Sequence, residues 1–460
     1  MNPNNIKNLY FVGAGGIGMS ALIRYFLSKG KKIAGYDRTR SELAEKLISE
    51  GVDIHFIEDE KLIPPDFRNK NTTLVIFTPA VPHEHVELKY FREYGFKILK
   101  RSQLLGLITK STKGLCVAGT HGKTTVSSML AHLLKHSATD CNAFLGGVSK
   151  NYDNNVLLSD KSDFTVIEAD EYDHSFHCLA PYMAVITATD PDHLDIYNTP
   201  NAYRESFEKF TSLILPGGAL LLKKGTNITP NLAENVKLYT YSSTDKTSDF
   251  HAENIRINNE EIHFDFISPT LRVINVQLGV PVKVNIENAV AAMALASLNG
   301  VTADEMRNAM KSFAGVERRF DLKVKTAKTV YIDDYAHHPE ELKKSILSVR
   351  ELYGGRKISA IFQPHLYTRT RDFAVEFAES LSLLDELILL DIYPAREEPI
   401  TGVTSQIIFD KVTIPDKILC GKDELMKIVE NKHFDILMTL GAGDIDRFVK
   451  PLTEELKRRE

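Results

Sequence analysis

Short, mainly apolar runs alternate with longer amphipathic segments along almost the whole chain. Runs of five residues at 8–12 and 32–36 predict buried strands. The segments 16–28 and 41–50, whose apolar residues recur every three or four positions, predict helices. Further strands are expected at 73–77, 164–167, 183–187, 219–222, 330–332, 359–362, 386–390 and 436–440, and further helices at 126–134, 285–298 and 303–313. Strands alternating with helices predict an α/β fold class with parallel sheets.

The alternation falls into three blocks. A chain of 460 residues fits three domains at a prior of about 150 residues each. We expect a Rossmann-like N-terminal domain over residues 1–109 and a P-loop ATPase-like central domain over 110–316. The central block carries a β-rich insert at 255–278. A second Rossmann-like domain is expected over 317–460.

The segment 115–125 is the most informative one in the chain. It reads Leu-Cys-Val-Ala-Gly-Thr-His-Gly-Lys-Thr-Thr, an apolar strand that runs into a glycine-bearing turn and then a helix. Gly119 and Gly122 allow backbone N–H groups to point at phosphate oxygens, Lys123 brings a positive charge, and Thr124 offers a hydroxyl to Mg²⁺. The loop is a shortened variant of the usual one. It predicts ATP or GTP binding, with a purely structural turn as the alternative.

A second glycine-rich turn follows the first predicted strand. It comprises Gly13, Ala14, Gly15, Gly16, Ile17 and Gly18, and Asp37 ends the next strand. The pattern is that of a dinucleotide site, so an NAD-dependent oxidoreductase is a legitimate alternative. Turns of this kind also hold any diphosphate at a helix N-terminus. A tight turn without a ligand is the remaining interpretation.

Carboxylates gather at two further predicted strand ends. Residues 168–173 read Glu-Ala-Asp-Glu-Tyr-Asp, and His193 lies among the aspartates of 190–195. Crowded carboxylates are costly without a compensating cation, and Mg²⁺ prefers hard oxygen ligands. We expect Thr124, Glu171 and His193 to form a metal site. A solvated acidic loop is the alternative.

The third block holds polar clusters after two strands. Residues 333–339 read Asp-Asp-Tyr-Ala-His-His-Pro, and 363–372 contain His365, Arg369 and Arg371. Arg319 precedes both clusters, near the expected start of the domain. Arginines clamp carboxylates or phosphates bidentately, so these residues predict an anion-binding site. Surface charge is the alternative.

Composition narrows the function classes. The apolar fraction of 43% and charged fraction of 25% are those of a globular protein, and the net charge of −5 gives no basic field for nucleic acid. Four cysteines without a Cys-x-x-Cys pair argue against a zinc ribbon and suit a reducing cytosol. We see no targeting segment and no membrane span, and expect a cytoplasmic protein. The sequence leaves monomer and homodimer open.

At this point the chain resembles a known family, the Mur ligases of peptidoglycan synthesis. The resemblance spans the whole chain and is closest to the branch that adds L-alanine. It is carried by the motifs at 13–20, 118–125, 168–171, 192–195, 318–321, 333–339, 363–370 and 391–397.

The resemblance implies an ATP-dependent ligase that joins L-alanine to UDP-N-acetylmuramate, with Mg²⁺ as cofactor and Mn²⁺ as the alternative. It implies that residues 13–18 and Asp37 bind the UDP-sugar rather than NAD, and that Tyr335, His337 and Arg369 bind the amino acid. Catalytic roles are implied for Lys123, His193, Arg319, His337 and Arg369. The implied ATP set is Gly119, Thr120, His121, Gly122, Lys123, Thr124, Thr125, Asn288 and Arg319.

Three positions depart from the family pattern. Val284 stands where relatives usually have histidine, Ala188 where many have asparagine, and Leu366 where arginine is common. Phe207 matches the position at which sister ligases carry a carbamylated lysine, and its presence favours the alanine-adding branch. A sister enzyme that adds a recycled tripeptide, an oxidoreductase, and a non-enzymatic nucleotide-binding regulator are the alternatives.

Overall fold

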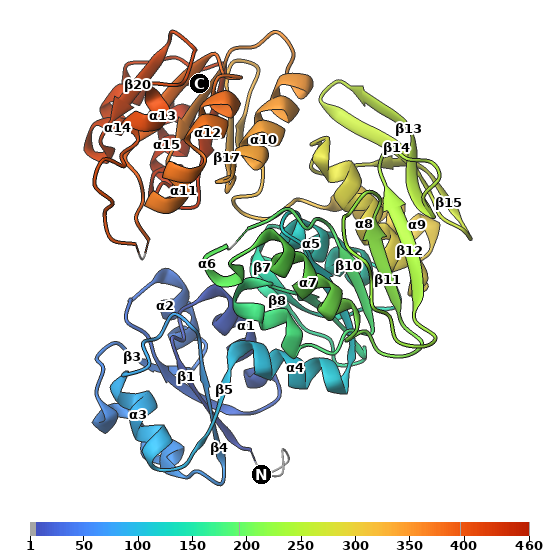
Figure 1. Cartoon of the computed structure of the whole chain (residues 1–460), viewed down its shortest axis with the longest axis vertical. Coiled ribbons are helices and arrows are strands. Elements are labelled where there is room, and N and C mark those ends of the chain that lie inside the picture. Colours follow the sequence, from blue (N-terminus) through green and yellow to red (C-terminus); the bar gives the residue numbers. More distant parts are fainter. Residues whose placement is uncertain (1–5, 193, 396, 460) are drawn as a thin grey trace. The chain divides into compact units, whose positions relative to one another are not determined.

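The computed structural model describes residues 6–192, 194–395 and 397–459. It contains three β-sheets, and helices connect many of their successive strands (Figure 1). The chain divides into two compact units. The first takes in the chain up to Glu253, together with Asp265–Val276 and Glu287–Phe313, and the second takes in Asn254–Phe264, Gln277–Ile286 and the chain from Ala314 onwards. The boundaries predicted near residues 109 and 316 stay predictions.

The N-terminal sheet has five strands in the order β3-β2-β1-β4-β5, all parallel. Parallel strands need crossover connections, and helices supply them here. The strands are β1 (Asn8–Val12), β2 (Lys32–Tyr36), β3 (Asp53–His55), β4 (Thr73–Phe77) and β5 (Lys97–Lys100), and the helices are α1 (Ile17–Ser28), α2 (Glu42–Ser49), α3 (Val86–Glu93) and α4 (Arg101–Ser111). This part has the Rossmann-like arrangement that was predicted.

The central sheet has ten strands in the order β15-β14-β13-β12-β11-β10-β6-β9-β7-β8. Its core strands are β6 (Lys113–Ala118), β7 (Asn142–Ser149), β8 (Asn154–Leu157), β9 (Phe164–Glu168), β10 (Met183–Ile186), β11 (Ala219–Lys223) and β12 (Lys237–Ser242). The connecting helices are α5 (Lys123–Lys135), α6 (Leu194–Tyr197) and α7 (Pro200–Thr211), with a 3₁₀ segment, η4 (Tyr172–Cys178). β6 is buried and pairs in parallel with β9 and β10, so its carboxyl end lies between theirs.

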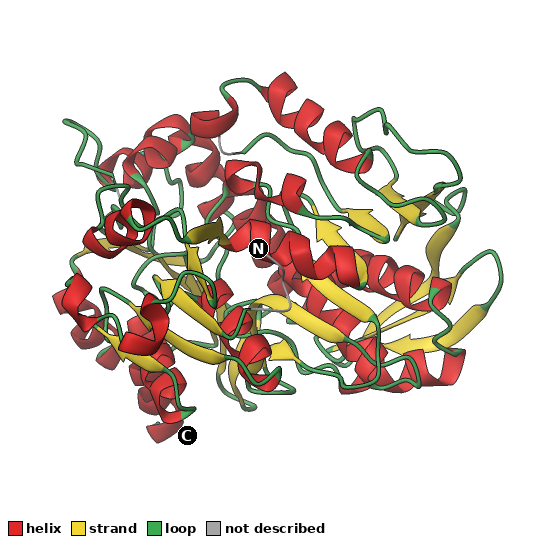
Figure 2. Ribbon diagram, turned by 90° about the horizontal axis from the view of Figure 1, so that it is seen from below, coloured by secondary structure: helices red, strands yellow, loops and turns green. Residues whose placement is uncertain are grey.

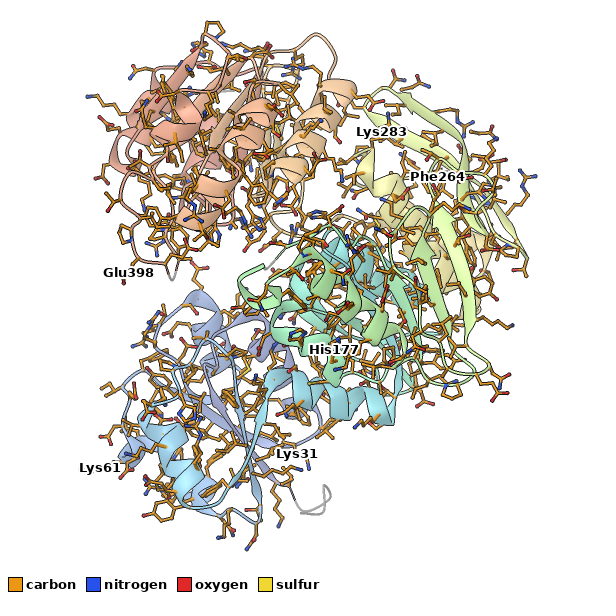
Figure 3. All side chains as sticks on the ribbon, in the orientation of Figure 1. Lys31, Lys61, His177, Phe264, Lys283 and Glu398 are labelled. Carbon is orange, nitrogen blue, oxygen red and sulfur yellow. The ribbon has the colours of Figure 1, made fainter. Side chains whose placement is uncertain are left out.

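The predicted β-rich insert continues the central sheet at one edge. It consists of β13 (Phe250–Asn258), β14 (Glu261–Ile267) and β15 (Arg272–Gln277), and β13 pairs in parallel with β12. Apolar side chains alternate along β14, where Phe264 (Figure 3) is fully buried. Because successive side chains of a strand point to opposite faces, this alternation is the pattern expected of a strand.

Helix α8 (Val284–Leu298) is apolar on nearly all sides, and α9 (Ala303–Ser312) follows it. The alanines of α8 are buried, and their small side chains let neighbouring elements approach closely. Thr302 caps α9 by accepting a hydrogen bond from the backbone N–H of Glu305. Both helices agree with their predicted ranges, 285–298 and 303–313, within one residue at each end.

The C-terminal sheet has six strands in the order β16-β17-β21-β18-β19-β20, with only β16 antiparallel to its neighbour. From β17 onwards, helices connect its successive strands. Figure 2 shows the helices and strands of the whole chain by colour. The strands are β16 (Asp321–Lys325), β17 (Val330–Asp334), β18 (Ile358–Phe362), β19 (Glu386–Leu390), β20 (Lys417–Cys420) and β21 (Ile436–Leu440), and the helices are α10 (Pro339–Leu352), α11 (Tyr367–Asp372), α12 (Ala374–Leu381), α13 (Gln406–Phe409), α14 (Lys422–Glu430) and α15 (Asp446–Arg458).

The three-part α/β architecture confirms the predicted fold class. Most predicted strands agree with the structure within two residues at each end. The phosphate-loop helix differs, since it begins at Lys123, three residues before the predicted start. The prediction began at the first apolar residue, Val126, and so left out the polar threonines of the first turn. Within the described ranges, no helix combines the length and the apolarity needed to cross a membrane.

Candidate nucleotide and amino-acid sites

The loop between β6 and α5, residues 119–122, has the backbone geometry of a phosphate loop. Gly119 has φ of +132° and Gly122 has φ of +81°, a left-handed region that favours glycine. A Cβ atom at Gly119 would lie 2.1 Å from the Thr187 Oγ1 atom, so a side chain does not fit there. Gly122 is the N-cap of α5, whose first-turn N–H groups are placed to meet an anion.

Lys123 is engaged in this structure with groups of the protein itself. Its Nζ donates to the Gly119 carbonyl oxygen at 2.7 Å and to Glu171 Oε1 at 2.9 Å. Burial lowers the pKa of Lys123, but the carboxylates of Glu171, Asp170 and Glu168 raise it by more, and the net shift is upward. The lysine therefore stays charged at the end of the loop.

The predicted metal ligands are only partly brought together. Thr124 Oγ1 donates to Glu168 Oε1 at 3.1 Å, whereas Glu171 is paired with Lys123. His193 lies outside the described residues. Among the residues that are described, no group of three or more histidine, cysteine or acidic side chains is arranged to hold a metal ion.

Glu168 was not among the predicted ligands. It is the last residue of β9, and its Oε2 also accepts from the backbone N–H of Gly146 at 3.1 Å. The hydroxyl of Thr124 and the carboxylate of Glu168 form a hard-oxygen pair of the type that Mg²⁺ prefers. The signal available in the sequence was the position of Glu168 at the strand end, two residues closer to the sheet than Asp170.

Other members of the predicted ATP set surround the loop. A Cβ atom at Gly122 would lie 2.8 Å from Asn288 Oδ1, which places α8 against the loop. Thr120 Oγ1 donates to the Asp190 carbonyl oxygen at 2.7 Å, and His121 Nε2 lies 3.8 Å from Asp190 Oδ2. Thr125, on the first turn of α5, is half-buried. These residues lie in the first unit, and Arg319 belongs to the second.

The glycine turn of residues 13–18 is shaped by Asp37. One carboxylate oxygen of Asp37 accepts from the Gly15 N–H at 2.7 Å and the other from the Thr39 N–H at 2.9 Å. Gly13 has φ of +88°. Helix α1 has no side-chain cap at Gly16, so its first-turn N–H groups carry no side-chain acceptor there. The turn has the form of a diphosphate cradle.

The amino-acid residues predicted in the second unit do come together. The Tyr335 and His337 rings have centroids 5.3 Å apart, and the Arg319 guanidinium lies 4.8 Å from the Tyr335 ring centroid. Arg369 is near enough to act on the pKa of His337. His365 adds a ring 5.9 Å from His337, a contact that residue spacing did not predict.

His337 is held as a neutral imidazole. Burial lowers its pKa most, Glu341 offsets part of this, and Arg369 and Arg319 lower it further, to about 4. Its Nδ1 lies 2.9 Å from the Tyr335 carbonyl oxygen, to which it must be the donor. The Nε2 atom is then left with the lone pair, so His337 is an acceptor of hydrogen bonds.

Arg318 fixes the segment that presents Arg319. Arg318 has φ of +60°, its Nη2 donates to the Gly441 carbonyl oxygen at 2.7 Å, and its Nε lies 3.4 Å from the buried Asp333. The backbone N–H of Tyr335 donates to the Arg318 carbonyl oxygen at 2.7 Å. This hydrogen bond therefore joins the backbone beside Arg319 to the backbone of Tyr335.

The positions that depart from the family pattern have separate surroundings. Phe207 is fully buried, with Phe176 and Tyr203 each 5.2 Å away between ring centroids, so it lies in an aromatic core that offers no ligand. The Ala188 carbonyl oxygen accepts from the Thr120 N–H. Leu366 has φ of +73° as the N-cap of α11, and Val284 is 41% exposed.

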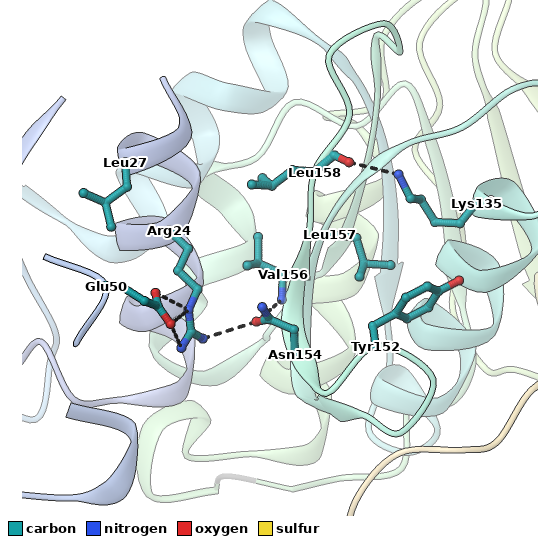
Figure 4. Close-up of a pocket in the computed structure, with 9 residues that line it drawn as sticks. All are labelled: Arg24, Leu27, Glu50, Lys135, Tyr152, Asn154, Val156, Leu157 and Leu158. Carbon is teal, nitrogen blue, oxygen red and sulfur yellow. Dashed lines mark hydrogen bonds and ion pairs between the residues drawn. The ribbon is translucent and has the colours of Figure 1, made fainter. Parts of the chain in front are cut away.

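A pocket in the first unit is lined by other residues (Figure 4). Its cations are already paired: Arg24 donates to Glu50 and to Asn154, and Lys135 forms an ion pair with Asp140. None of the predicted site residues lines this pocket. It therefore adds nothing to the candidate sites.

Comparison with known proteins identifies the class. Models described as "Mur ligase family, catalytic domain", "Mur ligase middle domain" and "Mur ligase, glutamate ligase domain" match residues 8–113, 117–296 and 318–443. The chain belongs to the Mur ligase family.

Individual relatives are similar over their full length. A protein of Parabacteroides distasonis, named UDP-N-acetylmuramate--L-alanine ligase, is 65% identical over 456 residues, which is 99% of this chain and 98% of the relative. A protein of the same name from Phocaeicola vulgatus is 61% identical over 460 residues, all of both chains. The crystal structure of UDP-N-acetylmuramate-alanine ligase from Thermotoga maritima superposes with a TM-score of 0.82 at 27% identity, covering 98% of this chain and 100% of that one.

Proposed function

We propose that this protein is an ATP-dependent ligase that joins L-alanine to the lactyl carboxylate of UDP-N-acetylmuramate, giving UDP-N-acetylmuramoyl-L-alanine, ADP and phosphate. The observation that carries the proposal is the 65% identity, over 99% of the chain, to a relative named for this reaction. The product serves peptidoglycan precursor synthesis. The glycine turn then holds the diphosphate of the sugar nucleotide rather than NAD.

The first chemical step activates a carboxylate, which is a poor electrophile. A carboxylate oxygen of UDP-N-acetylmuramate attacks the γ-phosphorus of ATP, ADP leaves with the bond electrons, and an acyl phosphate remains. Negative charge on the phosphoryl oxygens rises in the transition state, and fixed cations lower its energy. We assign this role to Lys123 and Arg319, with the N–H groups of the phosphate loop.

Mg²⁺, or Mn²⁺ in its place, would supply further charge neutralisation at the β- and γ-phosphates. Thr124 and Glu168 have the donor chemistry to hold such an ion, and Glu171 and His193 remain proposed ligands. In this structure Glu171 forms an ion pair with Lys123. When Lys123 binds phosphate instead, the Glu171 carboxylate loses its partner and can bind the metal ion.

The second step needs an uncharged amine. The amine nitrogen of alanine attacks the acyl carbon, a tetrahedral intermediate forms, and phosphate leaves with the bond electrons. We assign the carboxylate of alanine to Arg369, whose planar guanidinium binds carboxylates bidentately. The neutral His337 suits the other end of the amino acid, since its Nε2 lone pair accepts a hydrogen bond from the amine. The proton that the nitrogen loses when the amide forms leaves with the phosphate. Tyr335 packs beside it.

An ADP-release assay tests the proposal. Purified protein with UDP-N-acetylmuramate, ATP and Mg²⁺ is given single amino acids or the murein tripeptide in turn. L-Alanine is expected to give the highest kcat/KM. Preference for the tripeptide would replace the proposal with a recycling ligase, and absence of ADP release with every acceptor would remove the ligase assignment.

A further inference from the structure

Arg101 lies over the glycine turn of the N-terminal sheet. It is the first residue of α4, directly after β5, and its side chain is 25% exposed. A Cβ atom on Gly18 would lie 2.6 Å from Arg101 Nη1 and 3.1 Å from its Cζ. Since β1, β4 and β5 are parallel, their carboxyl ends share one edge of the sheet, where α1 and α4 also begin (Figure 1).

The same guanidinium faces the central sheet. Arg101 Nη2 lies 3.8 Å from Asp170 Oδ2, a loose ion pair between two partly exposed side chains. Asp170 follows β9 and is one of the carboxylates that raise the pKa of Lys123. Arg101 therefore stands between the glycine turn and the acidic residues beside the phosphate loop.

Lys100, the residue before Arg101, has a closer ion pair than Arg101 has. Lys100 Nζ donates to Asp173 Oδ2 at 2.8 Å, a full hydrogen-bonded ion pair. A separation of 3.8 Å is beyond hydrogen-bond distance, so Asp170 satisfies the charge of Arg101 without satisfying its N–H donors. A guanidinium gains more from a phosphate, which accepts two parallel N–H bonds, than it loses by leaving a carboxylate held at this separation.

We propose that Arg101 binds the diphosphate of the sugar nucleotide, and that Asp170 competes with the diphosphate for it. The inference rests on the proposed function and assigns a binding residue to its sugar-nucleotide site. Asp170 attracts Arg101 in the ligand-free chain and releases it when the diphosphate arrives. The sugar-nucleotide site is thereby linked to a carboxylate of the ATP-binding part.

Competition has a consequence that a structural ion pair lacks. If Asp170 merely stabilised the fold, its neutralisation would weaken ligand binding or leave it unchanged. If Asp170 restrains Arg101, its neutralisation strengthens binding of the sugar nucleotide. This gain in affinity must also disappear when Arg101 is replaced, because Asp170 and the diphosphate then have no guanidinium to compete for.

The experiment is calorimetric titration of UDP-N-acetylmuramate into the full chain, without ATP and with EDTA present. Arg101→Ala is expected to raise Kd at least about tenfold, and Arg101→Lys to raise it severalfold, because a lysine keeps the charge but loses the fork of donors. Asp170→Asn is expected to lower Kd about threefold, the size of effect for a partly exposed pair. The double variant should match Arg101→Ala.

Lys100→Ala is the matched control, since it removes an equal charge from the adjacent residue. Its Kd should stay within about twofold of wild type. Unchanged binding in Arg101→Ala, an equal loss in Lys100→Ala, or unchanged or weaker binding in Asp170→Asn would each overturn the inference alone. A wild-type chain that binds no sugar nucleotide would overturn the proposed function as well. A gain in affinity in Asp170→Asn cannot come from misfolding, so the test does not depend on the stability of Arg101→Ala.

Discussion

Glu87 on α3 is a buried carboxyl group, and its replacement by glutamine gives a prediction with a definite sign. Its side chain is fully buried, and its Oε2 accepts from the Tyr10 hydroxyl at 2.7 Å. Burial raises the pKa of Glu87 from 4.5 to about 7, while the hydrogen bond from Tyr10 lowers it in part. His55 Nε2 is 3.4 Å from the other carboxylate oxygen.

The folded state therefore binds the Glu87 proton more tightly than the unfolded chain does. Its contribution to stability is complete below pH 4.5 and is lost as the pH rises through about 7. A difference of 2.5 units, from 4.5 to 7, corresponds to about 3 kcal/mol at 1.36 kcal/mol per unit. Glu87→Gln has no such proton, and most of this difference falls between pH 5 and pH 8, so relative to wild type it should gain about 2.5 kcal/mol over that range.

The measurement is amide hydrogen exchange of the full chain, followed in peptides that cover β1 and β4 at both pH values. Comparing variant with wild type at one pH cancels the intrinsic exchange rate. The neighbouring His55 and His85 have pKa values lowered by burial and lose stability below pH 6.5, but they do so in both proteins. Glu84→Gln, a change at an exposed position, is the matched control. An equal difference between Glu87→Gln and wild type at both pH values would refute the reasoning.

The remaining predictions concern the candidate sites. Lys123→Ala should lower kcat about a thousandfold with the fold intact, because it removes the fixed charge beside the phosphates; near-normal ADP release from a folded variant would contradict it. Glu168→Gln and Glu171→Gln should both raise the Mg²⁺ concentration for half-maximal activity, Glu168→Gln about tenfold and Glu171→Gln less, since Glu168 contacts Thr124; a Mg²⁺ titration that leaves both unchanged removes the site. Arg369→Lys should lower kcat/KM for L-alanine about tenfold with ATP affinity preserved, as steady-state kinetics with alanine, glycine and serine would reveal; unchanged alanine use would show that the carboxylate binds elsewhere.

The sequence by itself determined the local elements and the loops between them. The strand at Asn8–Val12 and the phosphate-loop helix follow from patterns that need only neighbouring residues. Gly119 and Gly122 could be identified as turn residues because positive φ is a local property of glycine. The three-part α/β fold followed from the same alternation.

Only the tertiary structure decided which of several similar side chains meet. Spacing could not choose between Glu168 and Glu171 for contact with Thr124, since the carboxylates are three residues apart and more than forty residues from the loop. The neutral state of His337 depends on burial, which no local pattern gives. The contact of Arg101 with Gly18 and Asp170 joins three separate segments. The sequence specifies the chemical groups one residue at a time. Their burial, protonation states and distances are set only when the sheets form and bring the strand ends together.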